Sequence, residues 1–157
     1  MKPLLVIGLG NSLMGGDGIG CAVTDRLASD QRLPDYAEVL SAGSDLLRCA
    51  GWMEDRRRVV VIDAILDDHS EPGFVRAFED GCGLEERQDH AHHLSAVQAI
   101  RLLQMLTPVP CTLLGISVVS VEAGVGIPAG LNARIPAILD RVLQELRRWA
   151  PDSKEVS

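Results

Sequence analysis

The chain has 157 residues, of which 46% are hydrophobic and only 3% aromatic, and its formal net charge is −7. This length and apolar content predict a single domain over residues 1–150, with a core of Leu, Val, Ile and Ala, followed by a polar tail at 151–157. The negative charge argues against a nucleic-acid partner, because phosphate binding needs a basic face. There is no apolar run of 18 residues, so we expect no membrane span.

The amino-terminal residues lead straight into an apolar run without the cleavage-site pattern of a signal peptide, which predicts a cytoplasmic protein. The four cysteines, Cys21, Cys49, Cys82 and Cys111, include no C-x-x-C pair. This spacing disfavours a zinc knuckle and is typical of a reduced cytoplasmic protein whose thiols are buried or idle.

The first predicted element and the loop after it, residues 4–20, read LLVIGLGNSLMGGDGIG. The apolar run at 4–7 predicts a strand buried on both faces of a parallel sheet. The glycines behind it predict sharp turns, and apolar residues at helical spacing predict a helix that begins near Asp17. Asp17 therefore falls at the carboxyl edge of the sheet, where open α/β folds keep their sites.

Several roles are open to this glycine-rich loop. A dinucleotide fingerprint needs a third glycine where Leu13 stands, and a phosphate loop needs a lysine after the glycines, so both nucleotide-binding patterns match poorly. The loop can instead present Asp17 as a functional carboxylate. Asp17 can also serve only as a helix cap, a role that Asp fills well, and the residue taken alone favours the cap.

Beyond the first helix, a turn forms around Pro34, and residues 37–41 (AEVLS) predict a second, shorter strand. Residues 42–44 predict another turn at the edge of the sheet. Residues 45–52 then predict a short helix with Ser44 as its cap.

The strongest strand signal in the chain is at residues 59–62, which are β-branched throughout and predict a central strand. Asp63 follows directly, and we expect it, like Asp17, at the carboxyl edge of the sheet. The alternative is a turn residue that satisfies local N–H groups. Because Ala64 and Ile65 continue the apolar run, the sequence leaves both roles open.

Residues 73–78 (GFVRAF) predict an edge strand with Arg76 pointing outward, and residues 79–89 predict a polar loop. Residues 111–121 predict the last buried strand, and residues 128–149 predict the closing amphipathic helix. Pro136 lies inside that helical pattern, which predicts a kink or a late start.

Three of the four histidines, His90, His92 and His93, stand just before a helix predicted for residues 94–106. Each taken singly is more simply part of a solvated helix start. Histidine is, however, the commonest metal ligand and the usual base at neutral pH, and three together favour one that points into a site.

Strands that alternate with helices in this way predict an α/β fold, an open, mostly parallel twisted sheet of about five strands with both faces covered. Asp17, Asp63 and one histidine then all fall where strands end. Two carboxylates and an imidazole suit a divalent first-row metal with open coordination positions. The G-x-S-x-G nucleophile elbow is absent, so Ser-His-Asp hydrolysis has little support.

Three segments together, GLGNSLMGGDGIG, VVVIDAI and HHLS, resemble the peptidases that mature nickel–iron hydrogenases, and the resemblance covers residues 4–149. It implies a three-layer α/β/α sandwich in which Asp17, Asp63 and His92 are the catalytic and metal-binding residues at the sheet edge. His92 is chosen because the family's ligand stands two places before a leucine, and a shift of one residue would select His93.

The resemblance also implies an activity, namely an endopeptidase that removes a C-terminal extension from a hydrogenase large-subunit precursor after nickel has been inserted. The three ligands would engage nickel that the precursor already carries, while Gly43 and Asn11 would hold the nearby peptide. No organic cofactor is implied, and we expect a monomer. The alternative is a non-catalytic metal-binding chaperone for hydrogenase assembly that uses the same ligands.

Overall fold

A computed structural model describes residues 1–11, 15–67, 69–80, 94–120 and 126–152 of the chain. Its strands are β1 (Leu4–Leu9), β2 (Ala37–Gly43), β3 (Arg58–Leu66), β4 (Val75–Glu79) and β5 (Cys111–Val118). Its α-helices are α1 (Ile19–Ala28), α2 (Ala50–Met53), α3 (Leu94–Leu106), α4 (Ala129–Asn132) and α5 (Ile135–Arg147). Short 3-10 helices, η1 (Gly15–Gly18) and η2 (Leu46–Cys49), precede α1 and α2.

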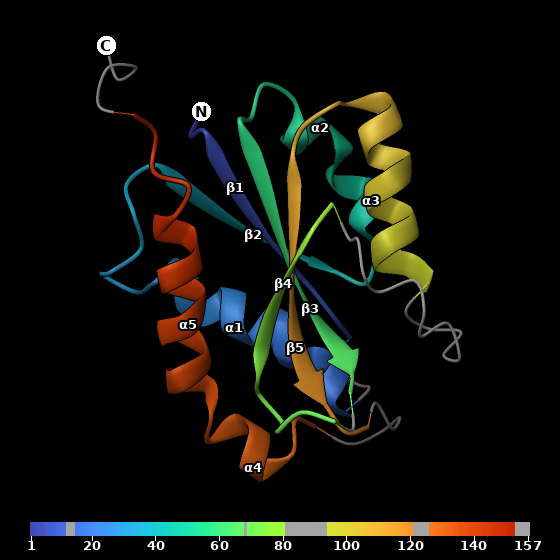
Figure 1. The fold of residues 1–157 in the computed structure, drawn as a ribbon, viewed down its shortest axis with the longest axis vertical. Coiled ribbons are helices and arrows are strands. Elements are labelled where there is room, and N and C mark those ends of the chain that lie inside the picture. Colours follow the sequence, from blue (N-terminus) through green and yellow to red (C-terminus); the bar gives the residue numbers. More distant parts are fainter. Residues whose placement is uncertain (12–14, 68, 81–93, 121–125, 153–157) are drawn as a thin grey trace.

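Within the described residues the five strands form one sheet in the order β2-β1-β3-β5-β4 (Figure 1). Strands β2, β1, β3 and β5 run parallel to one another, whereas β4 pairs antiparallel with β5 at one edge. The predicted open, mostly parallel sheet and the predicted edge strand are therefore confirmed.

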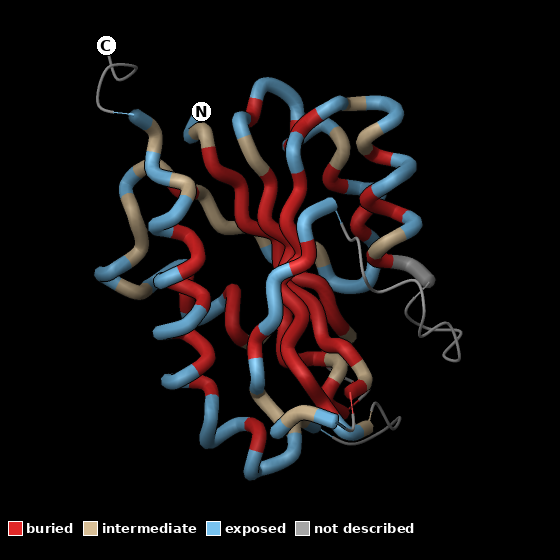
Figure 2. The backbone as a smooth tube through the Cα atoms, in the orientation of Figure 1, coloured by how far each residue is buried: buried red, intermediate tan, exposed pale blue. Residues whose placement is uncertain are grey.

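Helices cover both faces of the sheet, α1 and α5 on one face and α2 and α3 on the other (Figure 1). Successive side chains along a strand point to opposite faces of the sheet, so β3 contributes side chains to two apolar clusters, one on each face. Val60 and Ile62 pack toward α1 and α5, whereas Val59 and Val61 pack toward α2 and α3. Figure 2 shows the buried residues gathered in the strands and on the inward sides of the helices. The predicted three-layer α/β/α sandwich is confirmed.

The central strand is longer than predicted, and this changes the position of Asp63. β3 continues to Leu66, so Asp63 lies inside the strand, paired with Gly115 of β5. The prediction that the strand ends at Asp63 is wrong, and Asp63 is not a turn residue, although it accepts a local N–H, that of Ala64, as the alternative had it. The reason is that β5 runs beside β3 as far as Val118 and keeps it extended. β5 itself ends at Val118, short of the predicted residue 121.

The helix starts depart from the predictions in two places. The short helix predicted over residues 45–52 consists of η2 and α2, and its cap is Asp45, not Ser44. The carboxylate of Asp45 accepts a hydrogen bond from the N–H of Leu47 at 3.1 Å. The closing helix is divided into α4 and α5, with Pro136 in the first turn of α5, so the predicted late start is confirmed.

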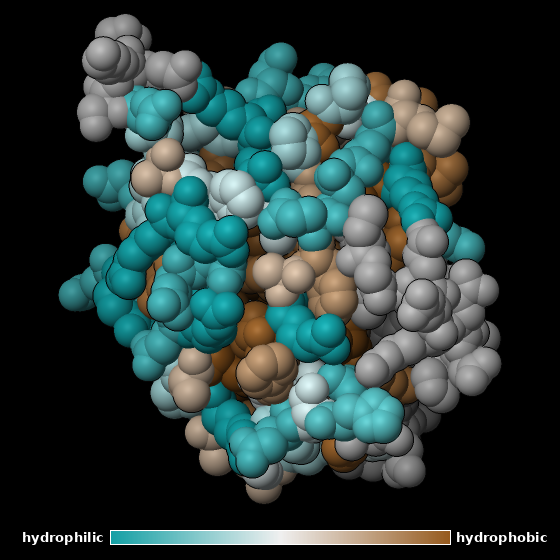
Figure 3. All heavy atoms as spheres, viewed as in Figure 1, coloured by the Kyte–Doolittle hydropathy of each residue, from teal (hydrophilic) through white to brown (hydrophobic). Residues whose placement is uncertain are grey.

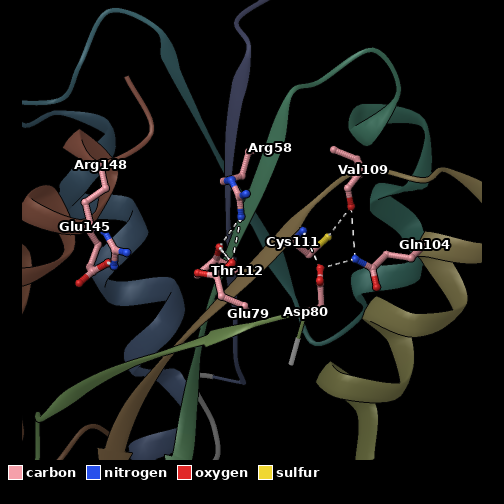
Figure 4. A network of polar contacts seen from close by, with 9 residues as sticks. All are labelled: Arg58, Glu79, Asp80, Gln104, Val109, Cys111, Thr112, Glu145 and Arg148. Carbon is pink, nitrogen blue, oxygen red and sulfur yellow. Dashed lines mark hydrogen bonds and ion pairs between the residues drawn. The ribbon is translucent and has the colours of Figure 1, made fainter. Parts of the chain in front are cut away.

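Polar contacts tie the edge strand β4 to the sheet at the end remote from the predicted site (Figure 4). The guanidinium of Arg58 donates to Glu79 at 3.1 Å and to Thr112 at 2.8 Å. The next residue, Asp80, accepts from the side-chain amide of Gln104 at 2.7 Å and from the N–H of Cys111 at 3.2 Å. These contacts hold β4 against β3, β5 and α3.

One further prediction can be compared with the structure, and another falls on residues that the structure does not describe. Arg76 of β4 is exposed, as expected for an outward edge-strand residue. The predicted polar loop beyond residue 80, together with His90, His92 and His93, lies outside the described residues. Of the helices in the described ranges, none combines the length and the apolar character needed to cross a membrane.

Candidate active site

The order of the strands reverses between β1 and β3, and this reversal positions the candidate site. The chain places β2 on one side of β1 and then crosses to β3 on the other side. In open α/β sheets such a reversal opens a crevice at the carboxyl ends of the strands, because the two connections leave toward opposite faces. The loop after β1 and the carboxyl-terminal half of β3 meet at this point.

Asp63 lies on β3 one residue beyond the last pairing between β3 and β1. It is only 5% exposed, and its Oδ1 accepts a hydrogen bond from the N–H of Ala64 at 2.8 Å. Because side chains alternate along a strand, its carboxylate lies on the same face as Val61 and Ile65, the face covered by α2 and α3.

The electrostatics of Asp63 are unusual for an aspartate. Burial raises the pKa of Asp63 to about 8, and the negative charge of Asp17 adds to the increase, against a smaller lowering by the N–H of Ala64. Within the part of the chain that the structure describes, no Lys, Arg or His forms an ion pair with either carboxylate. A divalent cation would stabilise both groups in their ionised form, so this donor pair fits a metal.

Asp17 lies in η1, at the end of the loop that follows β1. Its Oδ2 accepts a hydrogen bond from the backbone N–H of Asn11 at 2.9 Å, so the carboxylate links the end of the loop to its beginning. The N-cap of α1 is Gly18, which has no side-chain cap. The helix-cap role that the sequence favoured for Asp17 is therefore wrong.

Two glycines let this loop lie directly on the strand ends. Gly10 has φ +146°, and a Cβ there would collide with the carbonyl oxygen of Asp17. A Cβ at Gly20 would collide with the carbonyl oxygen of Leu9 and lie 2.7 Å from that of Ile62. Only glycine permits backbones to approach this closely, and the approach brings the loop carboxylate toward the carboxylate on β3.

Gly43 ends the edge strand β2 beside the same loop. Its carbonyl oxygen accepts a hydrogen bond from the N–H of Gly10 at 2.8 Å. Gly43 is exposed, has φ +63°, and has open space where a Cβ would point. An extended peptide can hydrogen-bond to backbone at such a sheet edge, so the arrangement suits peptide binding.

The structure therefore brings Asp17, Asp63 and Gly43 together around the end of β1, with Asn11 contributing its backbone to the loop. His92 lies outside the described residues, although α3, which follows it, covers the face on which Asp63 lies. The described ranges contain no group of three or more His, Cys, Asp or Glu residues that could hold a metal ion, and those ranges leave out the histidines before α3.

Gly115 is a site residue that the sequence interpretation missed. It pairs with Asp63 across β3 and β5, and a Cβ at this position would lie 2.9 Å from the side chain of Ile65. Ile65 therefore fills the space that glycine leaves beside the buried carboxylate. The available signal was a glycine inside an otherwise apolar strand, which marks a close approach.

Cys21 also supports the loop. Its Sγ lies 3.6 Å from the carbonyl oxygen of Gly8 and 3.5 Å from that of Gly10, so its single S–H is shared between these two acceptors. Burial raises the pKa of the Cys21 thiol, so the group stays protonated and suits this donor role better than metal ligation. In the sequence nothing separates Cys21 from an ordinary core thiol.

Comparison with known proteins gives a consistent assignment. The family model HycI, described as hydrogenase maturation protease, matches residues 21–145. The hydrogenase 2 maturation protease of Escherichia coli (strain K12) is 29% identical over 148 residues, which is 92% of this chain and 90% of that protein. The hydrogenase expression/formation protein HupD of Rhizobium leguminosarum bv. viciae is 26% identical over 152 residues, 93% of this chain and 75% of that protein.

Solved structures agree with the sequence comparisons. The hydrogenase maturating endopeptidase HybD from E. coli superposes with a TM-score of 0.74 at 29% identity, over 94% of this chain and 93% of that one. The [NiFe] hydrogenase maturation protease HybD from Thermococcus kodakarensis gives a TM-score of 0.71 at 28% identity, over 93% and 99%. Sequence and fold thus agree, and the chain belongs to the hydrogenase maturation protease family.

Proposed function

We propose that this chain is a metal-dependent endopeptidase that removes the C-terminal extension of a nickel–iron hydrogenase large-subunit precursor after nickel insertion. Membership of the hydrogenase maturation protease family supports the peptidase activity and the class of substrate. The observation that carries the finer proposal is the buried carboxylate of Asp63 beside Asp17 at the reversal of the strand order.

In this proposal Asp17, Asp63 and His92 engage the nickel that the precursor carries. Two carboxylates and an imidazole suit a divalent first-row ion. The raised pKa of Asp63 means that the isolated enzyme disfavours the ionised carboxylate, and an arriving cation reverses this preference. In this proposal the metal of the site is supplied by the nickel-bearing precursor.

The peptide beside the nickel is held at the sheet edge. Gly43 offers exposed backbone at the end of β2, and the loop around Asn11 borders it. With the peptide fixed there, the nickel carried by the substrate would supply Lewis-acid chemistry for hydrolysis of the scissile bond. The enzyme's contribution is the position of its carboxylates and of the peptide backbone.

This arrangement makes nickel the signal for cleavage. A ligand shifts an outcome only through its different affinity for two states, here the precursor with and without nickel. Metal-free precursor therefore stays uncut, and free nickel added to the enzyme alone produces no general protease activity. We place this reaction in the cytoplasm, in keeping with the free thiols of Cys21, Cys49 and Cys111, and we assign it to a monomer.

The test is co-expression of the chain with candidate large-subunit precursors, with and without nickel, and mass spectrometry of each precursor. We expect one precursor to lose its C-terminal extension only when nickel is supplied, and the Asp63→Asn variant to leave it intact. Asp25→Asn, an exposed change on α1, is the matched control. A stable complex without loss of mass would identify a chaperone instead, and cleavage of metal-free precursor or casein would contradict the nickel signal.

A further inference from the structure

A second hollow opens at the same edge of the sheet, at the carboxyl end of β5. It is a pocket of about 240 Å³ with mostly apolar walls. Its lining includes Gly16, Val118, Val119, Pro128, Leu131 and Arg134. In the same orientation as Figure 1, Figure 3 shows hydrophobic surface between α5 and β4, above α4.

The pocket shares a wall with the candidate active site. Gly16, which precedes Asp17 in η1, packs so tightly on the end of β5 that a Cβ would lie 2.7 Å from the carbonyl oxygen of Ser120 and 3.1 Å from the Cβ of Val118. The short helix η1 therefore carries the candidate catalytic carboxylate and also closes one side of the pocket.

The pocket and the buried carboxylate lie on opposite faces of the sheet. Val118 and Leu131, which line the pocket, belong to the cluster under α1 and α5, whereas Asp63 lies on the face of α2 and α3. β3 and β5 continue past Asp63 to Leu66 and Val118, a distance of about 10 Å at the rise of a strand. An extended peptide that crosses the edge covers this distance in about three residues.

We propose that this pocket binds an apolar side chain of the substrate, one of the first few residues of the C-terminal extension beyond the scissile bond. The inference rests on the proposed function, because that function puts the nickel-bearing part of the precursor at Asp63. The extension then leaves over η1 toward α4 and α5. The volume of the pocket suits one side chain the size of Leu or Phe. Val119 is 65% exposed, and such a side chain would cover its apolar surface.

Arg134 lies at the mouth of the pocket, and its charge does not make the interior of the pocket polar. Its guanidinium pairs with Glu71 at 3.2 Å, which neutralises the charge at the mouth. An acidic side chain therefore gains little from the pocket, whereas an apolar one loses its contact with water. In apolar pockets one methylene changes selectivity by about 10-fold or more.

Gly130 offers a way to narrow the pocket. It lines the pocket on α4, and a Cβ there would meet no atom within 4 Å, so Gly130→Phe adds bulk at the wall of the pocket. Val119→Ala widens the pocket at an exposed position. Gly51→Phe, on α2 and equally open, is the matched control remote from the pocket.

The substrates are variants of the precursor that the wild-type chain cleaves, in which each early residue of the extension is replaced in turn by Ala, Leu, Phe or Asp. We expect one position at which wild type prefers Leu or Phe to Ala by about 10-fold or more. Gly130→Phe should reverse this preference, Val119→Ala should shift it toward Phe, and Gly51→Phe should keep the wild-type ratio. Thermal unfolding of each variant checks its fold.

Three results would overturn the proposal. The first is that wild type shows no preference for any side chain in the extension. The second is that Gly130→Phe reduces the cleavage of all substrates equally. The third is that the Gly51→Phe control changes the side-chain preference in the same way as Gly130→Phe. If wild type cleaves the precursor and any of these is found, only the pocket assignment fails. If wild type cleaves no precursor, the proposed function fails and the pocket assignment fails with it.

Discussion

Asp63 is buried beside Asp17, and burial together with the charge of Asp17 raises the pKa of Asp63 to about 8. The ionised carboxylate of Asp63 opposes folding, because it is buried and has no cation partner among the described residues. Such a cost in stability is characteristic of sites that gain their compensating interactions only from a ligand.

The first prediction is that Asp63→Asn stabilises the isolated protein at pH 8 by about 1 kcal/mol or more. The unfolded chain releases the Asp63 proton near pH 4, whereas the folded chain keeps it to about pH 8. The free energy of unfolding of wild type therefore decreases as the pH rises through this window, and Asn abolishes this contribution. Urea unfolding at pH 5 and pH 8 measures both effects. Asp25→Asn should keep the wild-type pH dependence, and an Asp63→Asn variant that keeps it too would refute the assignment.

The second prediction separates the two possible uses of Asp17. The carboxamide oxygen of Asp17→Asn can still accept the N–H of Asn11, so the loop should be preserved. The melting temperature should stay the same or rise, because the charge that opposes ionisation of Asp63 is removed. Cleavage should nevertheless decrease by about 100-fold or more, the order lost with one electrostatic contact to a reacting centre. Asp17→Glu, which keeps the charge, should retain substantial activity. Equal activity of Asn and Asp in a timed cleavage assay would show that the residue only closes the loop.

The third prediction concerns the packing of α1 on the strand ends. Gly20→Ala places a Cβ against the carbonyl oxygens of Leu9 and Ile62, and overpacking of this kind costs about 1–3 kcal/mol. Gly51→Ala, in an open position of α2, should be neutral or stabilise by up to about 1 kcal/mol. Chemical unfolding of the two variants gives the comparison. An equal effect of both substitutions would mean that the first loop is not packed as described.

The fourth prediction tests Gly43 as a contact for the peptide. Its φ of +63° strains most side chains, so Gly43→Ala should cost about 1 kcal/mol, whereas Asn, which tolerates this conformation, should cost less. Both side chains enter the open space at the end of β2. KM for the precursor should therefore rise in both variants, even where stability is nearly restored. An unchanged KM in the Asn variant would remove Gly43 from the substrate site.

The fifth prediction is that the thiols are not ligands. Burial raises the pKa of Cys111 to about 12, and it also raises the pKa of Cys21 and of Cys49. Protonated thiols bind metals poorly. Replacement of all four cysteines, Cys82 included, by Ala or Ser should keep nickel-dependent cleavage, with some loss of melting temperature from repacking. Loss of cleavage in a folded variant would contradict this.

Much of the fold follows from local sequence because the parallel strands are buried on both faces and appear as short apolar runs. The strand limits depend on partners that are distant in the chain. β3 continues through Asp63 because β5, about fifty residues later, pairs with it. Likewise, Ser44 and Asp45 are chemically equivalent as caps, and the extended backbone of Asp45, φ −122°, decides between them.

The candidate site was predictable in composition but not in geometry. An acid after the first strand and an acid near the end of the central strand are visible in the sequence. Whether Asp17 caps α1 depends on the N–H of Asn11, a contact made across the loop. The choice between His92 and His93 stays a prediction.

The position of β2 at the edge of the sheet has a consequence for hydrogen exchange. Just before Asp63, residues 59–62 of β3 pair with both β1 and β5, so their amides should exchange slowly, through global unfolding. Within the described residues β2, which carries Gly43, pairs with β1 alone and can open locally. The carboxylate is thus fixed on a slowly exchanging strand, while the peptide-binding edge can adjust, and extensions of different sequence can be admitted without moving the acid.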